Sequence, residues 1–538
     1  MIQDREIAKA VSRIRQRAER QSDFQKLLES YVDSGIVPQL DNENHQVFYG
    51  RRGTGKTHVF QVLRNNFENE NYCVTYIDCR TLGSSTQFTD RDQPISRRCL
   101  ALFRDILSPI YNRLLEDIIE YYPEEGEKAL EAIDELMKSI TEPFQIFETK
   151  EVEILRSEES EDKFGVNVSS ELAKPSFRSG FEVGGSSKSA TQQNKKVEVK
   201  TEDKIIFPAI HHFLTEALKF SRFKLVVLLD EWSSLPRDIQ PYLAEFLKRG
   251  FLPVTNATLK IAALEQRSLF SLTDGHDIIG FELGADISMT QDLDDVYVYD
   301  RNPDGISTFY GDIILRHLEI ELPENYLRDT YKINSSSHFM SKMFTEKKTF
   351  FELSRAAEGV IRDLINIFTI SFFYAQKRSR STIDKKSILE SSRQWFEQDK
   401  AQHLDESMQT SLRKIIEEVI GNKNSRSFLL PRDLEKHSMI LKLFDARVIH
   451  HMQRGYADKD NPGVRYNIYN LDYGTYVDLM GTSKEPDIDL QIINEEQDED
   501  MIVPFDDKRS IRRIILTKDV LESVEQNTVG RPGGLAAF

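Results

Sequence analysis

Residues 50–57 read GRRGTGKT and match the pattern G-x-x-x-x-G-K-[ST], with an expected strand before them at 45–49 and an expected helix after them at 58–66. Glycines at these positions let backbone N–H groups turn inward around phosphate oxygens, and the positive end of the following helix strengthens that attraction. Lys56 would neutralise the β- and γ-phosphates, while the hydroxyl of Thr57 would hold Mg²⁺. The stretch therefore predicts the start of a parallel α/β sheet that binds a nucleotide.

A second motif closes the most apolar run of the chain, KLVVLLDE at residues 224–231. Its length suits a strand that is buried on both faces, and open parallel sheets bind ligands at the carboxyl ends of their strands. Adjacent side chains on a strand point to opposite sides. Asp230 can therefore face Mg²⁺ while Glu231 polarises the water that attacks the γ-phosphate.

Together the two motifs predict ATP and Mg²⁺ as cofactors and a slow ATPase activity. Lys56 and Glu231 are the expected catalytic residues, and Thr57 and Asp230 are the expected metal ligands. The nucleotide is expected to contact Gly50, Arg51, Arg52, Gly53, Thr54, Gly55, Lys56, Thr57 and His58.

The 538 residues are long enough for about three domains. We expect an ATPase domain over 1–304, with amphipathic N-terminal helices within 4–34 and further strands at 72–78, 259–264 and 296–299. An insertion at about 123–203 is expected to carry a β-hairpin formed by 164–168 and 179–183, because polar and apolar residues alternate there between Gly/Ser clusters. An all-helical unit follows over 305–400.

Residues 401–481 show helices followed by two runs of β-forming residues at 448–452 and 464–469, which is the order of a winged helix. Residues 423–470 hold nine Lys/Arg and five Asp/Glu, although the whole chain has a formal charge of −17. Double-stranded DNA and a docked protein both stay open as partners of this unit. If DNA is bound, Arg447 and Arg454 are expected to contact its phosphates.

The tail, the cysteines and the lack of long apolar runs limit the classes of protein that the sequence allows. Residues 482–538 form an acidic tail that is expected to be loose at its end. Three cysteines cannot form a disulfide framework, and no Cys/His cluster has zinc spacing. The start of the chain has no apolar leader, and no run approaches the roughly 18 apolar residues that span a bilayer, so a cytoplasmic protein without a membrane partner is expected.

The motifs YGRRGTGKTH, VVLLDEWSSLP, LKIAALEQRS and EGVIRDLINIF resemble the AAA+ ATPases, within them the origin-recognition and archaeal initiator group, and the related STAND ATPases. The resemblance covers about Asp23 to Met480. The segments around Asp230 and Gln266 are also similar to bacterial ATP-binding proteins of largely uncharacterised role. The resemblance implies a helical lid over 305–400.

The resemblance also implies roles for single residues. Gln266 or Arg267 stands at the sensor 1 position, which contacts the γ-phosphate, and an Arg there is typical of STAND proteins. Arg362 in the Gly-x-x-Arg pattern stands at sensor 2, where a guanidinium can fork onto two phosphate oxygens. AAA+ rings also use an arginine finger from a neighbouring subunit. No Arg lies between 268 and 300, so Arg301 and Arg249 are the remaining candidates.

The expected function is a nucleotide-dependent switch or assembly factor of the AAA+/STAND type, acting on a protein partner or effector, as in bacterial defence against phage. Further copies of the chain are an expected partner as well. The alternative is a DNA-binding AAA+ loader, initiator or transposition-type regulator that acts on duplex DNA. A scaffold that binds nucleotide without turnover is the third hypothesis.

Overall fold

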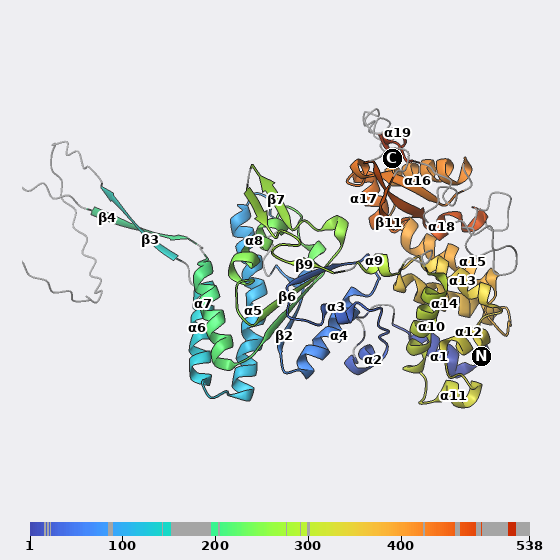
Figure 1. The fold of residues 1–538 in the computed structure, drawn as a ribbon, viewed down its shortest axis with the longest axis horizontal. Helices are drawn as coiled ribbons and strands as arrows, with labels where there is room; N and C mark the ends of the chain where they lie inside the picture. The colour runs from blue at the N-terminus through green and yellow to red at the C-terminus, as the bar shows by residue number, and fades with distance from the viewer. Residues whose placement is uncertain are drawn as a thin grey trace, which may run out of the picture.

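The computed structural model describes residues 1–15, 18, 21, 23–83, 90–141, 144–151, 195–202, 205–275, 277–290, 292–297, 302–422, 425–457, 463–479, 486 and 515–522. Figure 1 shows the ATPase sheet in the middle of the molecule, with the helical unit and the C-terminal unit together on one side and a long two-stranded arm on the other.

A five-stranded parallel sheet in the order β2-β5-β6-β1-β9 forms the centre of the ATPase domain. The strand β5 has side chains buried on both faces, as its apolar run predicts: Leu225, Val227 and Leu229 enter one core, while Val226 and Leu228 enter another. The strands are β1 (Gln46–Tyr49), β2 (Cys73–Asp78), β5 (Leu225–Asp230), β6 (Ala257–Ala263) and β9 (Ser288–Met289).

Helices cover both faces of this sheet. On one face the core contains α3 (Val37–Leu40) and α4 (Lys56–Asn69). On the other face it contains α5 (Ile95–Tyr121), α6 (Gly126–Thr141), α7 (Phe207–Ser221) and α8 (Gln240–Gly250).

Of the last strand predicted at 296–299, Val296 ends a helix and Tyr297 caps it, while 298 and 299 lie outside the described residues. β9 pairs with β1 through Ser288 and Met289, and α9 (Leu293–Val296) follows it. The helical turn forms because the side chain of Asp292 accepts from the backbone N–H of Asp294 at 2.9 Å and so caps the first turn. A short hairpin of β7 (Ser271–Asp274) and β8 (Asp277–Gly280) lies between β6 and β9 in the chain and was not predicted.

The described part of the insertion contains a two-stranded antiparallel arm. β3 (Phe144–Glu151) pairs with β4 (Lys195–Glu202), and Figure 1 shows the pair extending away from α6 and α7. The strands predicted at 164–168 and 179–183 lie outside the described residues.

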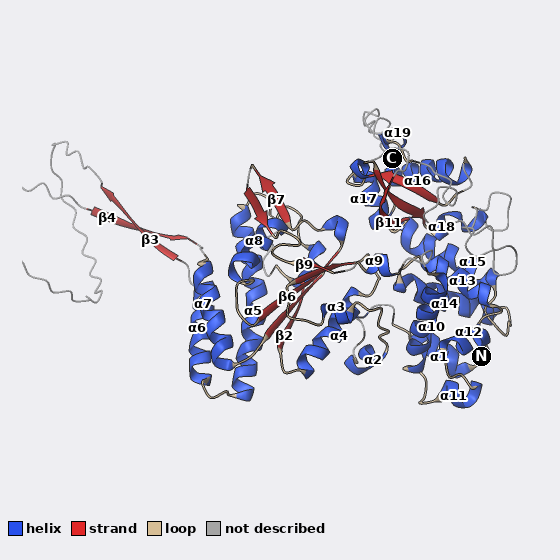
Figure 2. Ribbon diagram, in the orientation of Figure 1, coloured by secondary structure: helices blue, strands red, loops and turns tan. Residues whose placement is uncertain are grey.

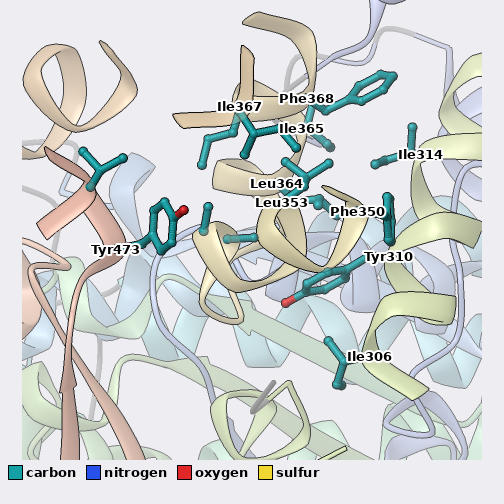
Figure 3. Close-up of a cluster of buried hydrophobic side chains, with 14 of the residues drawn as sticks. Ile306, Tyr310, Ile314, Phe350, Leu353, Leu364, Ile365, Ile367, Phe368 and Tyr473 are labelled. Carbon is teal, nitrogen blue, oxygen red and sulfur yellow. The ribbon is translucent and has the colours of Figure 1, made fainter. Parts of the chain in front are cut away.

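A third hydrophobic core joins the helical lid to the C-terminal unit and to the first helix of the chain. Figure 3 shows Tyr310 and Ile314 packed beside Leu353 and Leu364, with Tyr473 of the C-terminal unit next to them. The lid consists of α10 (Pro303–Glu319), α11 (Tyr326–Tyr331), α12 (Ser336–Met343), α13 (Lys347–Ala357), α14 (Ile361–Lys377) and α15 (Lys385–Trp395).

The N-terminal helices divide between the lid and the ATPase domain. α1 (Arg5–Arg13) packs on the lid through Ile7 and Val11, although the sequence groups it with the ATPase domain. The side chain of Asp4 caps α1 and also accepts from the hydroxyls of two lid tyrosines, Tyr326 at 2.9 Å and Tyr331 at 2.6 Å. α2 (Phe24–Glu29) contacts α4 of the ATPase domain.

The C-terminal unit has the helices and the three-stranded antiparallel sheet of a winged helix, which confirms the predicted fold class. Figure 2 shows its strands beside the largely helical lid. Its sheet order is β10-β12-β11. Its elements are α16 (Glu406–Ile416), β10 (Ser427–Pro431), α17 (Ser438–Asp445), β11 (Ile449–Ala457), β12 (Arg465–Leu471) and α18 (Tyr473–Tyr476).

Part of the predicted tail packs against the winged helix. Ile515 forms a bridge with Leu429 of β10, and α19 (Lys518–Glu522) buries Leu521 in the core shared with the lid. The apolar residues Leu516 and Leu521 explain this, because they bury surface that an entirely polar tail lacks. Within the described residues, no helix is both long and apolar enough to cross a membrane.

Candidate nucleotide site

The phosphate-binding loop connects β1 to α4 and contains two glycines with left-handed backbone angles. φ is 88° at Gly53 and 97° at Gly55, a region in which other residues are strained. Lys56 begins α4 and is buried, and its Nζ donates to the carbonyl oxygens of Gly50 at 2.7 Å and Arg51 at 3.0 Å. Burial lowers the pKa of this ammonium, while nearby carboxylates oppose the shift. Phosphate oxygens could replace the two carbonyl oxygens as acceptors.

The carboxylate of Asp230 lies at the carboxyl end of β5 and is fully buried. Its Oδ2 accepts from Thr57 Oγ1 at 2.7 Å and from the Tyr76 hydroxyl at 3.0 Å. Burial raises the pKa of Asp230, and the Glu231 carboxylate adds to the rise, so a cation beside Asp230 would be favoured. Mg²⁺ prefers such oxygen ligands and often takes only one or two from the protein, next to phosphates. Thr57 and Asp230 therefore fit a Mg²⁺ site.

Glu231 stands directly after β5 in a left-handed conformation, with φ at 55° and ψ at 37°. Its backbone N–H donates to Asp230 Oδ1 at 2.8 Å. The residue lines the same cleft as Lys56 and Thr57. This position suits a carboxylate that orients a water toward a phosphate held by the loop.

The loop, the N-terminal segment and the lid enclose a solvent-open cleft of about 870 Å³. His58 lies on one wall, where its Nε2 contacts the carbonyl oxygen of Leu27 at 2.7 Å, and His317 of α10 lies on another. Burial lowers the pKa of His58 to about 4 and also lowers that of His317, so both rings are neutral at pH 7. Apolar walls come from Ile14, Leu27, Ile320, Ile361 and Ile365.

Arg362 is the second residue of the lid helix α14 and lies at the edge of this cleft. Its backbone N–H donates to the carbonyl oxygen of Gly53 at 3.1 Å, so the lid touches the phosphate-binding loop directly. A Cβ on Gly53 would lie 2.9 Å from Cβ of Arg362 and 3.0 Å from Cγ1 of Val360. The contact therefore depends on a glycine at position 53.

The two arginines of the loop lie on its other side. Arg51 is buried, and Asp294 accepts from both its backbone N–H at 3.0 Å and its Nε at 2.8 Å. Arg52 is exposed and lines a second, smaller cavity between the loop and the winged helix. In this arrangement the Arg51 side chain points away from the phosphate cleft toward the winged helix.

The expected sensor 1 and finger residues lie apart from the cleft described above. Nε of Arg267 donates to Asp445 of α17 at 2.6 Å, and Gln266 lines the cavity beside the winged helix. Arg249 is exposed and pairs with Glu245 one helical turn away. Arg301 lies outside the described residues.

The two winged-helix arginines that were expected to contact DNA both face the rest of the chain. Arg447 is buried and pairs with Asp363 at 2.8 Å and also with Asp399. Arg454 pairs with Glu265 at 2.6 Å and Asp292 at 2.7 Å. Both side chains are thus engaged with acidic residues of the ATPase domain or the lid in this arrangement, and their contact with DNA phosphates stays a prediction.

Sequence patterns did not predict which elements surround the cleft and the loop. The spacing of Ile7, Val11 and Ile14 indicates an amphipathic helix, yet it does not say that Ile14 lines the cleft. Nothing in the sequence around His450 pointed to the phosphate-binding loop. Nδ1 of His450 contacts Nη1 of Arg51, although the two residues are 399 positions apart in the chain.

A protein-family model described as ORC-CDC6-like matches residues 15–429. A search of curated proteins finds no significant match. Among solved structures, the chain is similar to the ORC2 protein of Aeropyrum pernix in ADPNP-ADP complexes, with 10% identity over 82% of this chain and 92% of that chain and a TM-score of 0.35. It is also similar to Cdc6p of Pyrobaculum aerophilum, with 12% identity, 88% and 97% coverage and a TM-score of 0.30.

Proposed function

Because this chain belongs to the ORC-CDC6-like family of AAA+ ATPases, we propose that it is an initiator-type ATPase that binds ATP and Mg²⁺ and binds duplex DNA under the control of that nucleotide. The observation that carries the ATPase part is the convergence of Lys56, Thr57, Glu231 and Arg362 on one cleft, with Asp230 bonded to Thr57. These residues come from the loop, the sheet and the lid, so the cleft joins the ATPase domain to the lid.

In the proposed reaction, Lys56 and Arg362 bind the terminal phosphates, and Glu231 orients the attacking water and accepts its proton. Mg²⁺, when bound at Thr57 and Asp230, would supply positive charge next to the phosphates. Charge-assisted hydrogen bonds from Lys56 and Arg362 would favour a lid position that depends on the γ-phosphate.

The DNA part of the proposal rests on exposed basic side chains of the winged helix. Lys436 precedes α17 and Lys442 lies within it, and Arg432 and Arg465 are exposed on the same unit. Lys442 has only a long contact of 3.9 Å with Asp405, and both side chains are more than half exposed. Such pairs contribute little to stability, so these cations can exchange partners for phosphates.

The ATPase part is tested by calorimetry of ATP binding to the intact chain and to Lys56→Ala. We expect the variant to lose measurable ATP affinity, because it removes the ammonium that neutralises the phosphates. Lys347→Ala, at an exposed site of the lid, is the matched control and should bind as the wild type does. Equal affinity in Lys56→Ala and the wild type would disprove the phosphate-binding assignment.

The DNA part is tested by filter binding of a duplex with and without ATP over a range of salt concentrations. Lys436→Glu with Lys442→Glu should weaken binding for every sequence and reduce the salt slope by about two, one for each lost phosphate contact. The control is Lys347→Glu with Lys348→Glu, which makes the same charge change on the lid. The same slope in both double variants would argue against the winged helix as the DNA site.

A protein-dependent switch is the second candidate, and one observation favours it. Arg447 and Arg454 are engaged within the chain, so the winged helix offers fewer cations to DNA than its composition suggests. ATP-dependent association with a protein, together with no duplex binding at low salt, would support the switch. The comparisons give no support to a role in phage defence.

A further inference from the structure

Arg51 is the residue of the phosphate-binding loop that touches all three units of the molecule. In the ATPase domain its Nε donates to Asp294 Oδ1 at 2.8 Å. In the lid its Nη2 donates to the carbonyl oxygen of Glu358 at 2.8 Å. In the winged helix its Nη1 contacts Nδ1 of His450.

The lid makes room for this guanidinium. Gly359 has φ at 83°, and a Cβ there would lie 2.9 Å from Nη2 of Arg51. The glycine therefore lets the arginine reach the Glu358 carbonyl oxygen. The close fit indicates a specific contact, because a residue with a Cβ at position 359 would displace the Arg51 guanidinium.

His450 is fully buried and is bonded at both ring nitrogens. Nε2 lies 2.8 Å from Asp472 Oδ1, and Nδ1 faces the Arg51 guanidinium. Since a guanidinium can only donate, Nδ1 must be the acceptor, and the proton of the neutral ring is on Nε2. Burial lowers the pKa of His450 to about 4, and the positive charge of Arg51 adds to this, in agreement with a neutral ring.

The same contacts continue to α14, the helix that contains Arg362. Asp472 and Asp363 share the buried ammonium of Lys400, and Nη1 of Arg447 donates to Asp363 Oδ1 at 2.8 Å. All of these groups are buried, and opposite charges alternate along the chain of contacts. The winged helix is thereby connected to the loop residue Arg51 and to the residue after Arg362.

We propose that His450 is a positioning residue of the nucleotide site, which acts through Arg51 to hold the phosphate-binding loop in the geometry that receives ATP. The inference rests on the proposed ATPase function. It makes the docked winged helix a working part of the site, in addition to any partner that this unit binds.

The backbone of Arg51 explains how the side-chain contact reaches the phosphates. Its carbonyl oxygen accepts from Lys56 Nζ at 3.0 Å and from Thr54 Oγ1 at 2.8 Å. If the guanidinium loses its partner on the winged helix, Asp294 and Glu358 still bind Arg51, but the peptide at position 51 is held by fewer contacts, so the acceptor of the two donors inside the loop is less firmly fixed.

Two substitutions each remove one of the two hydrogen bonds that the His450 ring makes and keep the other. Asparagine places its amide oxygen near the Nδ1 position, so His450→Asn keeps an acceptor for Arg51 and loses the donor to Asp472. Glutamine places its amide nitrogen near the Nε2 position, so His450→Gln keeps the donor to Asp472 and loses the acceptor for Arg51. Ile468→Ala is the matched control, because Ile468 is buried in a separate small core of the winged helix.

The test measures the dissociation constant of a fluorescent ATP analogue and the melting temperature of all four full-length proteins. We expect His450→Gln to bind about tenfold more weakly, since a hydrogen bond to a charged group is lost, while His450→Asn stays close to the wild type. Ile468→Ala should melt earlier with unchanged affinity. Wild-type affinity in His450→Gln, or an equal loss in Ile468→Ala, would overturn the proposal.

Hydrogen exchange of the backbone amides in residues 50–57 provides a readout that needs no nucleotide. Exchange there should be about tenfold faster in His450→Gln and unchanged in His450→Asn and Ile468→Ala. Unchanged exchange in His450→Gln would contradict the positioning role. If the wild type binds no ATP, the proposed function fails, whereas the exchange pattern still decides whether His450 holds the loop.

Discussion

The backbone of Glu231 is held in a conformation that is energetically unfavourable. Its φ of 55° is unfavourable for a residue with a Cβ, by about 1–2 kcal/mol. The bond from its N–H to Asp230 and the burial of Trp232, the next residue, keep the turn in place. Strain of this kind at the end of a central strand is common where a side chain must face a ligand.

We expect Glu231→Gln to bind ATP with unchanged affinity and to hydrolyse it about 10²–10⁴-fold more slowly, because an amide can orient a water but cannot accept its proton. Steady-state phosphate release and calorimetry measure the two quantities separately. Unchanged turnover would remove Glu231 from the catalytic role.

His450 carries a prediction about pH. Its pKa is about 4 in the folded chain and about 6.5 in the unfolded chain, so protons bind the unfolded state first as the pH falls. The contribution of the neutral His450 ring to the free energy of unfolding is present above pH 6.5 and is lost progressively as the pH falls toward 4. At pH 5 the loss is about 2 kcal/mol relative to a side chain that does not titrate.

Urea unfolding of the wild type and of His450→Asn at pH 7.5 and pH 5.0 checks this. The stability difference between them should shift by about 2 kcal/mol in favour of the variant at pH 5.0. Asp292, whose pKa burial raises to about 8, acts in the opposite direction, but it is present in both proteins and cancels. A stability difference that does not change with pH would mean that His450 already titrates normally.

At the scale of elements, the contact between the phosphate-binding loop and α14 decides how the lid meets the nucleotide. The loop presents the Gly53 carbonyl oxygen to the first N–H groups of α14, which have no partner within their own helix. The helix therefore begins on the loop, and movement of either element changes the position of Arg362 relative to Lys56.

Two glycines with nearly the same backbone angle allow a matched test of this contact. Gly53→Ala and Gly35→Ala both force alanine into the left-handed region, with φ at 88° and 86°, and each should lose about 1 kcal/mol of stability. An alanine Cβ at Gly35 meets nothing within 4 Å, whereas at Gly53 it meets Arg362 and Val360. Only Gly53→Ala should also weaken ATP binding, as calorimetry would show. Equal affinity in both variants would mean that the lid contact does not matter for the nucleotide.

At the scale of the whole molecule, the arrangement of the hydrophobic cores indicates which parts of the chain should unfold together. One core joins α1, the lid, the winged helix and α19, while two others lie on the faces of the sheet. The chain therefore should unfold as a sheet unit and a unit of lid and winged helix together. Each unit has one of the two tryptophans, Trp232 in the sheet unit and Trp395 in the lid.

Ile440→Ala removes a buried side chain of α17, which should cost about 2–5 kcal/mol. Denaturation is followed by fluorescence in a Trp232→Phe background and in a Trp395→Phe background. We expect the transition reported by Trp395 to shift, and that reported by Trp232 to shift much less. An unshifted Trp395 transition would show that the winged helix unfolds independently of the lid.

The sequence alone predicted the phosphate-binding loop, the doubly buried strand ending in Asp230 and Glu231, and the order of sheet, lid and winged helix. These features come from patterns within about ten residues, where backbone geometry and hydrophobic periodicity act locally. Only the tertiary structure decided that the last strand is Ser288–Met289, that α1 packs on the lid, and that Arg51 meets His450. Such contacts join residues hundreds of positions apart, and their energy depends on which buried surfaces and charges finally meet. Local sequence patterns therefore do not predict which of these distant residues come into contact.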